Sequence, residues 1–148
     1  MEIAILACGC FWGPEIKFSK LNGVVKTEVG YCGGKSENTS YEEVCTGKTN
    51  HAEVVKIEFN NKVITYENIL EYFFEIHDPT TLNQQGPDIG TQYRSEIFFY
   101  NKEQKEIAQK ILNKFIKNYN GKIVTKISEI KNYVCAEEYH QKYLEKEI

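Results

Sequence analysis

The sequence predicts an α+β domain of the ferredoxin-like class, an α/β sandwich in which helices cover an antiparallel sheet. Its apolar patterns give elements in the order β-α-β-β-α-β, the order of that fold, with a helix, a strand and a C-terminal tail appended. The chain has 148 residues, 41% of them hydrophobic and 13% aromatic, enough for one sizeable core but not for two. We therefore expect a single domain over residues 1–148.

Three strands and a short helix make up the first half of this predicted core. Residues 3–8 are a continuous apolar run typical of a buried strand, and a short helix then runs to about Leu21. A second strand is predicted for residues 24–31, and residues 41–45 allow one helical turn at most. Residues 52–59 alternate between two faces, which indicates a third strand.

Two longer helices follow, each behind a residue that can cap it. Apolar residues recur at helical spacing from 66 to 77 behind Thr65. The same spacing recurs behind Asn101 and ends at Asn120-Gly121. We expect both helices to be amphipathic.

The other segments of the second half are a long loop, two strands and a terminal helix. Residues 78–93 are rich in Thr, Gln, Asn, Gly and Asp, and loops of that length in compact domains tend to be functional or disordered. Residues 95–100 and 123–130 are predicted as strands. A polar helix is expected over residues 136–146.

Charge and hydropathy argue against several classes of function. The formal net charge is only −3, so the chain lacks the basic surface on which nucleic-acid binding relies. The longest weakly polar run, residues 3–13, is too short to cross a bilayer and lacks the basic start of a signal peptide. We expect a cytoplasmic protein with no nucleic-acid partner and no membrane partner.

The five cysteines, at positions 8, 10, 32, 45 and 135, indicate free thiols. An odd count does not suit a disulfide framework, and no C-x-x-C pair is present to anchor zinc. The three histidines have no mutual spacing that indicates a metal, and each is more simply a structural hydrogen-bonding residue. The residues therefore give only a weak signal for a metal site.

Cys10 is the candidate nucleophile, because it lies where the buried first strand gives way to a helix. The amides and the positive dipole end of a helix N-terminus stabilise a thiolate, which would raise the reactive fraction of the thiol. A small buried residue is an equally good interpretation of the spacing. Phe11 and Trp12 follow directly and suggest a pocket wall, although core packing is the more common role of such a pair.

Glu53 is the most informative polar residue, because strand alternation places it on the apolar face of residues 52–59. A carboxyl there must be paired or neutral, and keeping it protonated at pH 7 requires its pKa to rise by roughly 3 units. The alternative is exposure at a frayed strand end beside His51.

The long polar loop ends in side chains with several donors and acceptors, among them Asp88, Tyr93 and Arg94. Such loops often bind polar ligands. Alternatively, Arg94 pairs with Asp88 and only holds the loop together.

Seven short motifs are distributed over nearly the whole chain. They are GCFWG (9–13), GYCGG (30–34), SYEEV (40–44), HAEV (51–54), HDPT (77–80), GTQYRS (90–95) and AEEYHQ (136–141). In sequence and in order they resemble the A-type peptide methionine sulfoxide reductases.

The resemblance implies reduction of the S epimer of methionine sulfoxide, free or in oxidised proteins, by a cysteine without a metal or bound cofactor. Carried over motif by motif, it makes Cys10 the nucleophile and Glu53 the acid that protonates the sulfoxide oxygen. Tyr41 and Tyr93 would hold the same oxygen. The residues that would shape the pocket around the S-methyl group and its polar side are Phe11, Trp12 and Asp88.

The chain departs from the family pattern at two places. Asn50 stands where the family usually has Gly, and residues 143–148 stop short of the Gly/Cys-rich tail in which many members carry resolving cysteines. We therefore expect the oxidised Cys10 to be reduced directly by an external thiol, such as thioredoxin, glutaredoxin or a small thiol.

Three other cysteines are candidates for an internal disulfide with Cys10. Cys135 is the leading one, because it precedes the terminal helix in a segment that can move. Cys8 is disfavoured by ring strain and strand burial, and Cys45 would have to face Cys10 from a helical turn.

Two other classes of function fit the same residues. A cysteine-dependent thiol hydrolase or acyltransferase would use one of the histidines as a base. A noncatalytic binding module would use the Phe11-Trp12 pair to hold apolar peptide side chains.

Overall fold

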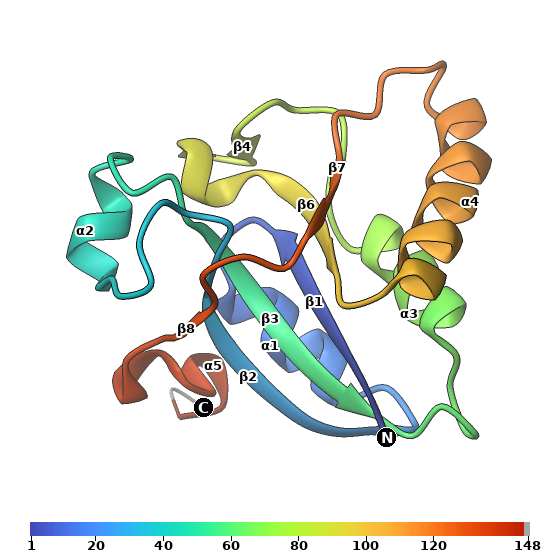
Figure 1. Ribbon diagram of the computed structural model, residues 1–148, viewed down its shortest axis with the longest axis horizontal. Helices are drawn as coiled ribbons and strands as arrows, with labels where there is room; N and C mark the ends of the chain where they lie inside the picture. Colours follow the sequence, from blue (N-terminus) through green and yellow to red (C-terminus); the bar gives the residue numbers. More distant parts are fainter. Residues whose placement is uncertain (147–148) are drawn as a thin grey trace.

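A six-stranded sheet forms the centre of the protein in the computed structural model, which describes residues 1–146 (Figure 1). Its strands are β1 (Glu2–Cys8), β2 (Val24–Cys32), β3 (Ala52–Phe59), β6 (Ser95–Phe99), β7 (Lys126–Glu129) and β8 (Val134–Cys135). The order is β7-β6-β1-β3-β2-β8, and the four central strands pair antiparallel in the ferredoxin-like order. β7 adds in parallel to β6, and β8 adds antiparallel to β2. The predicted fold class is confirmed.

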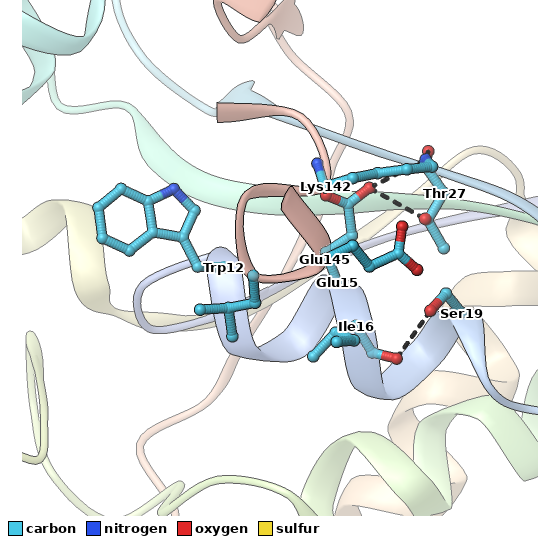
Figure 2. Close-up of a pocket in the computed structure, with 8 residues that line it drawn as sticks. Trp12, Glu15, Ile16, Ser19, Thr27, Lys142 and Glu145 are labelled. Atoms are coloured by element: carbon cyan, nitrogen blue, oxygen red, sulfur yellow. Dashed lines mark hydrogen bonds and ion pairs between the residues drawn. The ribbon is translucent and has the colours of Figure 1, made fainter. Parts of the chain in front are cut away.

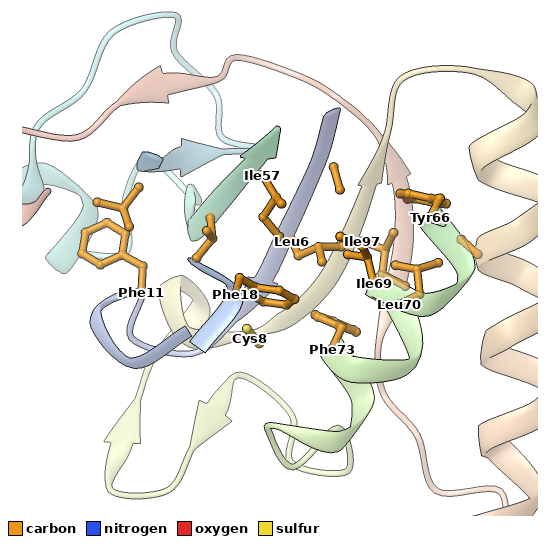
Figure 3. Close-up of a cluster of buried hydrophobic side chains, with 14 of the residues drawn as sticks. Leu6, Cys8, Phe11, Phe18, Ile57, Tyr66, Ile69, Leu70, Phe73 and Ile97 are labelled. Atoms are coloured by element: carbon orange, nitrogen blue, oxygen red, sulfur yellow. The ribbon is translucent and has the colours of Figure 1, made fainter. Parts of the chain in front are cut away.

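Helices α1 (Trp12–Ser19), α3 (Tyr66–Glu75) and α4 (Lys102–Asn118) cover one face of this sheet. The core between them includes Phe18 of α1 and Phe73 of α3, which pack with Leu6 and Ile57 of the sheet (Figure 3). Full burial of one such side chain contributes about 1.5–3 kcal/mol, so this core fixes the helices on the sheet. No helix within residues 1–146 is long and apolar enough to span a bilayer.

The helix caps form as the sequence predicts. Thr65 Oγ1 and Asn101 Oδ1 each accept a hydrogen bond from the backbone N–H three residues on, at 3.0 Å and 2.9 Å. Helix α2 (Tyr41–Cys45), the predicted single turn, begins in the same way at Ser40, whose hydroxyl accepts an N–H at 3.3 Å. These caps satisfy first-turn donors that the helices themselves leave free.

The opposite face of the sheet is covered by the chain between β7 and β8. This segment crosses in front of β1 and β3 in Figure 1. Ile130 and Tyr133 pack there against a second buried cluster that includes Ala7, Val54 and Phe98. The segment therefore closes the core from the side without helices.

The predicted helix over residues 136–146 is wrong. The structure has a 3₁₀ turn, η2 (Glu138–His140), and a four-residue helix, α5 (Tyr143–Lys146), separated by Lys142 at a φ of 52°. We call residues 136–146 the C-terminal strap.

Hydrogen bonds to β2 and to helix α1 explain why the strap is not one helix. Gln141 donates to the carbonyl of Val29 at 2.9 Å and accepts its N–H at 2.9 Å. The backbone N–H of Lys142 donates at 2.7 Å to the buried Glu15 carboxylate, which also accepts the Thr27 hydroxyl at 2.9 Å (Figure 2). The Gln141 bonds are made by its side chain, whereas a helix through Lys142 would need that backbone N–H for its own ladder.

Two other segments differ from the prediction. The strand predicted over residues 123–130 is reduced to β7, because the Val124 N–H donates instead to the carbonyl of Pro79 at 2.8 Å. The predicted loop over residues 78–93 contains short elements: β4 (Gln84–Gln85), β5 (Asp88–Ile89) and the 3₁₀ turn η1 (Thr91–Tyr93).

Candidate active site

Cys10 lies in the tight turn between the end of β1 at Cys8 and the start of α1 at Trp12, and it is partly exposed. The turn depends on Gly9, whose φ of 94° is easily adopted only by glycine. A Cβ at this position would also lie 2.7 Å from the side chain of Gln85. The backbone therefore places the thiol where the sequence predicts it, next to the N-terminus of a helix.

The electrostatic surroundings of Cys10 differ from the prediction. Burial raises the pKa of the thiol to about 11, the backbone N–H of Trp12 opposes this rise, and the carboxyl groups of Glu53 and Asp88 add to it. The stabilising amide expected of a helix N-terminus is present, but desolvation outweighs it. In the free protein the thiol therefore stays protonated at neutral pH.

Glu53 is buried, with 1% of its surface exposed, which confirms the prediction from strand alternation and rules out the frayed strand end. Its Oε1 accepts the N–H of Phe11 at 3.2 Å, and its Oε2 accepts the Gln92 amide at 3.4 Å. Burial raises the pKa of Glu53 to about 7, against the opposing effect of these two hydrogen bonds. The carboxyl beside Cys10 is thus about half protonated at pH 7.

The raised pKa of Glu53 predicts a pH-dependent stability. The native carboxyl keeps its proton up to about pH 7 and the unfolded one only to about pH 4.5. The native state therefore binds more protons between these values, and the free energy of unfolding falls as the pH rises through this window, by about 3 kcal/mol. Glu53→Gln should not show this loss. In urea unfolding, its free energy of unfolding should therefore fall less between about pH 4 and about pH 8 than that of the wild type. Parallel pH dependences for the two proteins would contradict the assignment.

Tyr41 and Tyr93 bring their hydroxyl groups to the same region from α2 and η1. Burial raises the pKa of Tyr93 to about 12, and the carboxyls of Glu53 and Asp88 add to the rise. Burial also raises the pKa of Tyr41. Both hydroxyls therefore remain protonated hydrogen-bond donors at neutral pH.

Phe11 and Trp12 occupy different environments. Phe11 is 1% exposed and packs in the core, 5.7 Å from the Tyr31 ring between centroids, so the structure bears out core packing for this residue. Trp12 is half-buried: its Nε1–H donates to His140 Nδ1 at 3.1 Å, and its ring stacks on Tyr143 at 3.9 Å between centroids and 12° between planes. Trp12 is the ring of the pair that retains exposed surface.

Asp88 lies on β5, close enough to influence the pKa values of Cys10, Glu53 and Tyr93. The alternative in which Arg94 pairs with Asp88 is wrong. The Arg94 guanidinium instead forms an ion pair with the buried carboxylate of Glu96 at 2.6 Å.

Cys135 lies apart from this group. It is exposed on β8, and the groove beside it is lined by residues of β2 and the C-terminal strap, among them Glu28, Glu138 and Gln141. None of the other predicted site residues lines that groove. Within residues 1–146, no group of three or more His, Cys, Asp or Glu side chains is arranged to hold a metal ion.

Sequence reasoning missed three residues that support the site. Gln92 holds the Glu53 carboxylate, and Tyr143 stacks on Trp12. Glu137 accepts the Tyr41 N–H at 2.9 Å and the Tyr31 hydroxyl at 2.7 Å, which ties the strap to the start of α2. Gln92 and Glu137 lie within the motifs at 90–95 and 136–141, but those motifs do not say which groups they bind, and Tyr143 lies outside every motif.

Comparison with known proteins identifies the class to which this site belongs, the oxidoreductases that act on oxidised sulfur. The family model "Peptide methionine sulfoxide reductase" matches residues 2–148. The chain belongs to this family, and within it to the A type, and it is an enzyme of methionine sulfoxide reduction.

Relatives of the chain share most of its length. It is 67% identical over 146 residues to peptide methionine sulfoxide reductase MsrA of Pelagibacter ubique, covering 99% of each chain. It is 53% identical over 152 residues to a probable peptide methionine sulfoxide reductase of Schizosaccharomyces pombe, covering 99% of this chain and 89% of the relative.

Solved structures of the family have the same fold. Mxr1 of Saccharomyces cerevisiae in reduced form matches with a TM-score of 0.95 at 44% identity, over 98% of this chain and 84% of that one. Mxr1 in complex with Trx2 matches with a TM-score of 0.69 at 30% identity, over 96% of this chain and 84% of that one.

Proposed function

We propose that this single-domain chain reduces the S epimer of methionine sulfoxide, free or in oxidised proteins, with Cys10 as the nucleophile and Glu53 as the acid. The observation that carries the proposal is the buried Glu53 carboxyl. It is bound to the N–H of the residue that follows Cys10, and its pKa is raised to about 7. A group that is both protonated and deprotonated near neutral pH is suited to general acid-base catalysis.

The proposed step transfers one oxygen atom and two electrons. The sulfoxide sulfur becomes electrophilic as its oxygen takes the proton of Glu53, and the Cys10 sulfur attacks it. The thiol proton of Cys10 restores the Glu53 carboxyl. The attack joins the Cys10 sulfur to the substrate sulfur. The hydroxyl then moves from the substrate sulfur to the Cys10 sulfur as the substrate S–O bond and the new S–S bond break. Methionine leaves with the electron pair of the S–S bond, reduced by two electrons, and Cys10 is oxidised to a sulfenic acid.

Other side chains would hold the substrate oxygen during this step. Tyr41 and Tyr93 carry protonated hydroxyls beside Cys10 and Glu53, and they would donate hydrogen bonds to the oxygen as charge develops on it. Asp88 would order the polar side of the pocket through a substrate amide or water.

Trp12 would bury the S-methyl group of the substrate, with Phe11 behind it in the core. Trp12→Ala should therefore raise KM or lower kcat/KM, because the methyl group loses an apolar wall. The rate of Cys10 alkylation by iodoacetamide should stay at the wild-type value. An alkylation rate that falls as much as kcat/KM would contradict a role in substrate binding.

Regeneration of Cys10 would use a thiol reductant. The structure of yeast Mxr1 with Trx2 supports thioredoxin in this role, and glutaredoxin or a small thiol offers the same chemistry.

One assay distinguishes this function from its alternatives. Turnover of the separate S and R epimers of methionine sulfoxide is measured with dithiothreitol, and methionine should form from the S epimer alone. A thiol hydrolase would instead turn over acyl substrates without need of a reductant, and a binding module would turn over neither. Among the hydrogen bonds of residues 1–146, none joins Cys10 to a histidine base, which disfavours the hydrolase.

A further inference from the structure

Cys45 is an exposed thiol that touches the candidate site. It is the last residue of α2, and its Sγ lies 3.3 Å from the side-chain nitrogen of Gln92. The same nitrogen lies 3.4 Å from Oε2 of Glu53. One amide group therefore bridges the Cys45 thiol and the proposed acid.

The two tyrosines support this location independently of Gln92. Burial raises the pKa of Tyr41 most, and a hydrogen bond with the side chain of Cys45 raises it further. Both Cys45 and Cys10 are near enough to raise the pKa of Tyr93. The Cys45 side chain at the end of α2 thus faces the region where the substrate oxygen would be held. An internal disulfide with Cys10 requires Cys45 to face the site from its helical turn, and it does.

The other cysteines are less suited to react with an oxidised Cys10. Cys8 and Cys32 are buried, and burial raises the pKa of their thiols to about 12 and about 11. Cys135 is exposed, but its surroundings are strands β2 and β8 and the strap, and its thiol contacts Gln141 and a neighbouring carbonyl. Only Cys45 combines exposure with contact to the site.

We propose that Cys45 is the resolving cysteine of this enzyme. The inference rests on the proposed function, which supplies the sulfenic acid on Cys10. The Cys45 sulfur attacks the Cys10 sulfur, the S–O bond breaks, and the oxygen leaves as water with the Cys45 proton and the sulfenic proton. A Cys10–Cys45 disulfide results, with no change in the total number of electrons, and a dithiol such as thioredoxin then reduces it.

Formation of the disulfide requires Cys10 and Cys45 to approach each other. A disulfide requires Cβ atoms about 3.5–4.5 Å apart, so any movement falls on the residues around the two cysteines. α2 has five residues, and Gly47, at a φ of 75°, follows it in a loop. The start of α2 is held by the bond from the Tyr41 N–H to Glu137. The approach therefore falls on its last residue, Cys45, and on the loop at Gly47.

The test is one turnover without reductant. Reduced enzyme is mixed with one equivalent of methionine-S-sulfoxide, methionine is quantified, and the thiols are alkylated and mapped by mass spectrometry. The wild type should release methionine, keep three of its five thiols and yield a Cys10–Cys45 peptide. Cys45→Ser should release methionine and leave a sulfenic acid on Cys10 that dimedone traps.

Cys135→Ser is the matched control, because it removes the other exposed thiol. It should still form the Cys10–Cys45 disulfide and keep turning over with a thioredoxin system, whereas Cys45→Ser should lose most of that turnover. If methionine is released but four thiols stay free, or a Cys10–Cys135 disulfide forms, Cys45 is not the resolving cysteine. The proposed function would still stand. Without methionine release, the proposed function fails and the inference fails with it.

Discussion

Replacing Cys10 with serine is expected to abolish the reduction of methionine sulfoxide while leaving the fold intact. A hydroxyl cannot accept the oxygen and give up two electrons as a thiol does, so no sulfenic acid forms. Cys10 is partly exposed in a turn, where serine fits without a cavity. Methionine formation with dithiothreitol and thermal unfolding should be measured for Cys10→Ser and for Cys135→Ser as the control.

The control variant should retain both activity and stability. If Cys10→Ser has the melting temperature of the wild type and still turns over methionine sulfoxide appreciably, the mechanism is refuted. Loss of activity together with loss of folding would instead assign Cys10 the structural role that the sequence left open.

Glu53→Gln should lower the rate of reduction by roughly 10² to 10⁴, the usual contribution of a general acid. Glutamine keeps the size of the side chain, and its oxygen can still accept the N–H of Phe11, but it donates no acidic proton. Tyr41→Phe and Tyr93→Phe should each cost less, because the remaining hydroxyl still holds the substrate oxygen. Single-turnover rates at a saturating sulfoxide concentration measure all three effects.

These variants also identify the acid if it is not Glu53. A nearly wild-type rate for Glu53→Gln combined with a large loss for Tyr93→Phe would transfer the proton donor to Tyr93. Alkylation of Cys10 in each variant checks that the thiol itself remains accessible.

Much of the fold follows from local patterns. The alternation of residues 52–59 gives β3 with the correct bounds, and Thr65 and Asn101 cap the helices that they precede. Alternation also identifies Glu53, because a carboxyl on an apolar face is a conflict that sequence alone displays. The motifs then supply the chemistry that burial alone leaves unspecified.

The remaining features depend on partners that are distant in sequence. The residues of the C-terminal strap favour a helix locally, but the φ of 52° at Lys142 and the bond from its N–H to Glu15 override that preference. The pKa of Cys10 differs from the prediction for a similar reason. Its desolvation comes from the packed surroundings, which the dipole argument for a helix N-terminus does not include. Gln92 and Glu137 act through groups on other elements, so no nearby residue signals their roles.

The strap also has a consequence for the synthesis of the protein. Trp12 and His140, which hydrogen-bond to each other, are 128 residues apart, so the wall beside Cys10 is completed only when nearly all of the described chain has been made. At about 5–20 residues per second, a ribosome needs roughly 6–26 seconds to add those residues. During that interval the nascent chain already carries Cys10, but the contact between Trp12 and His140 has not formed. The nucleophile is therefore made well before the wall that would bind its substrate.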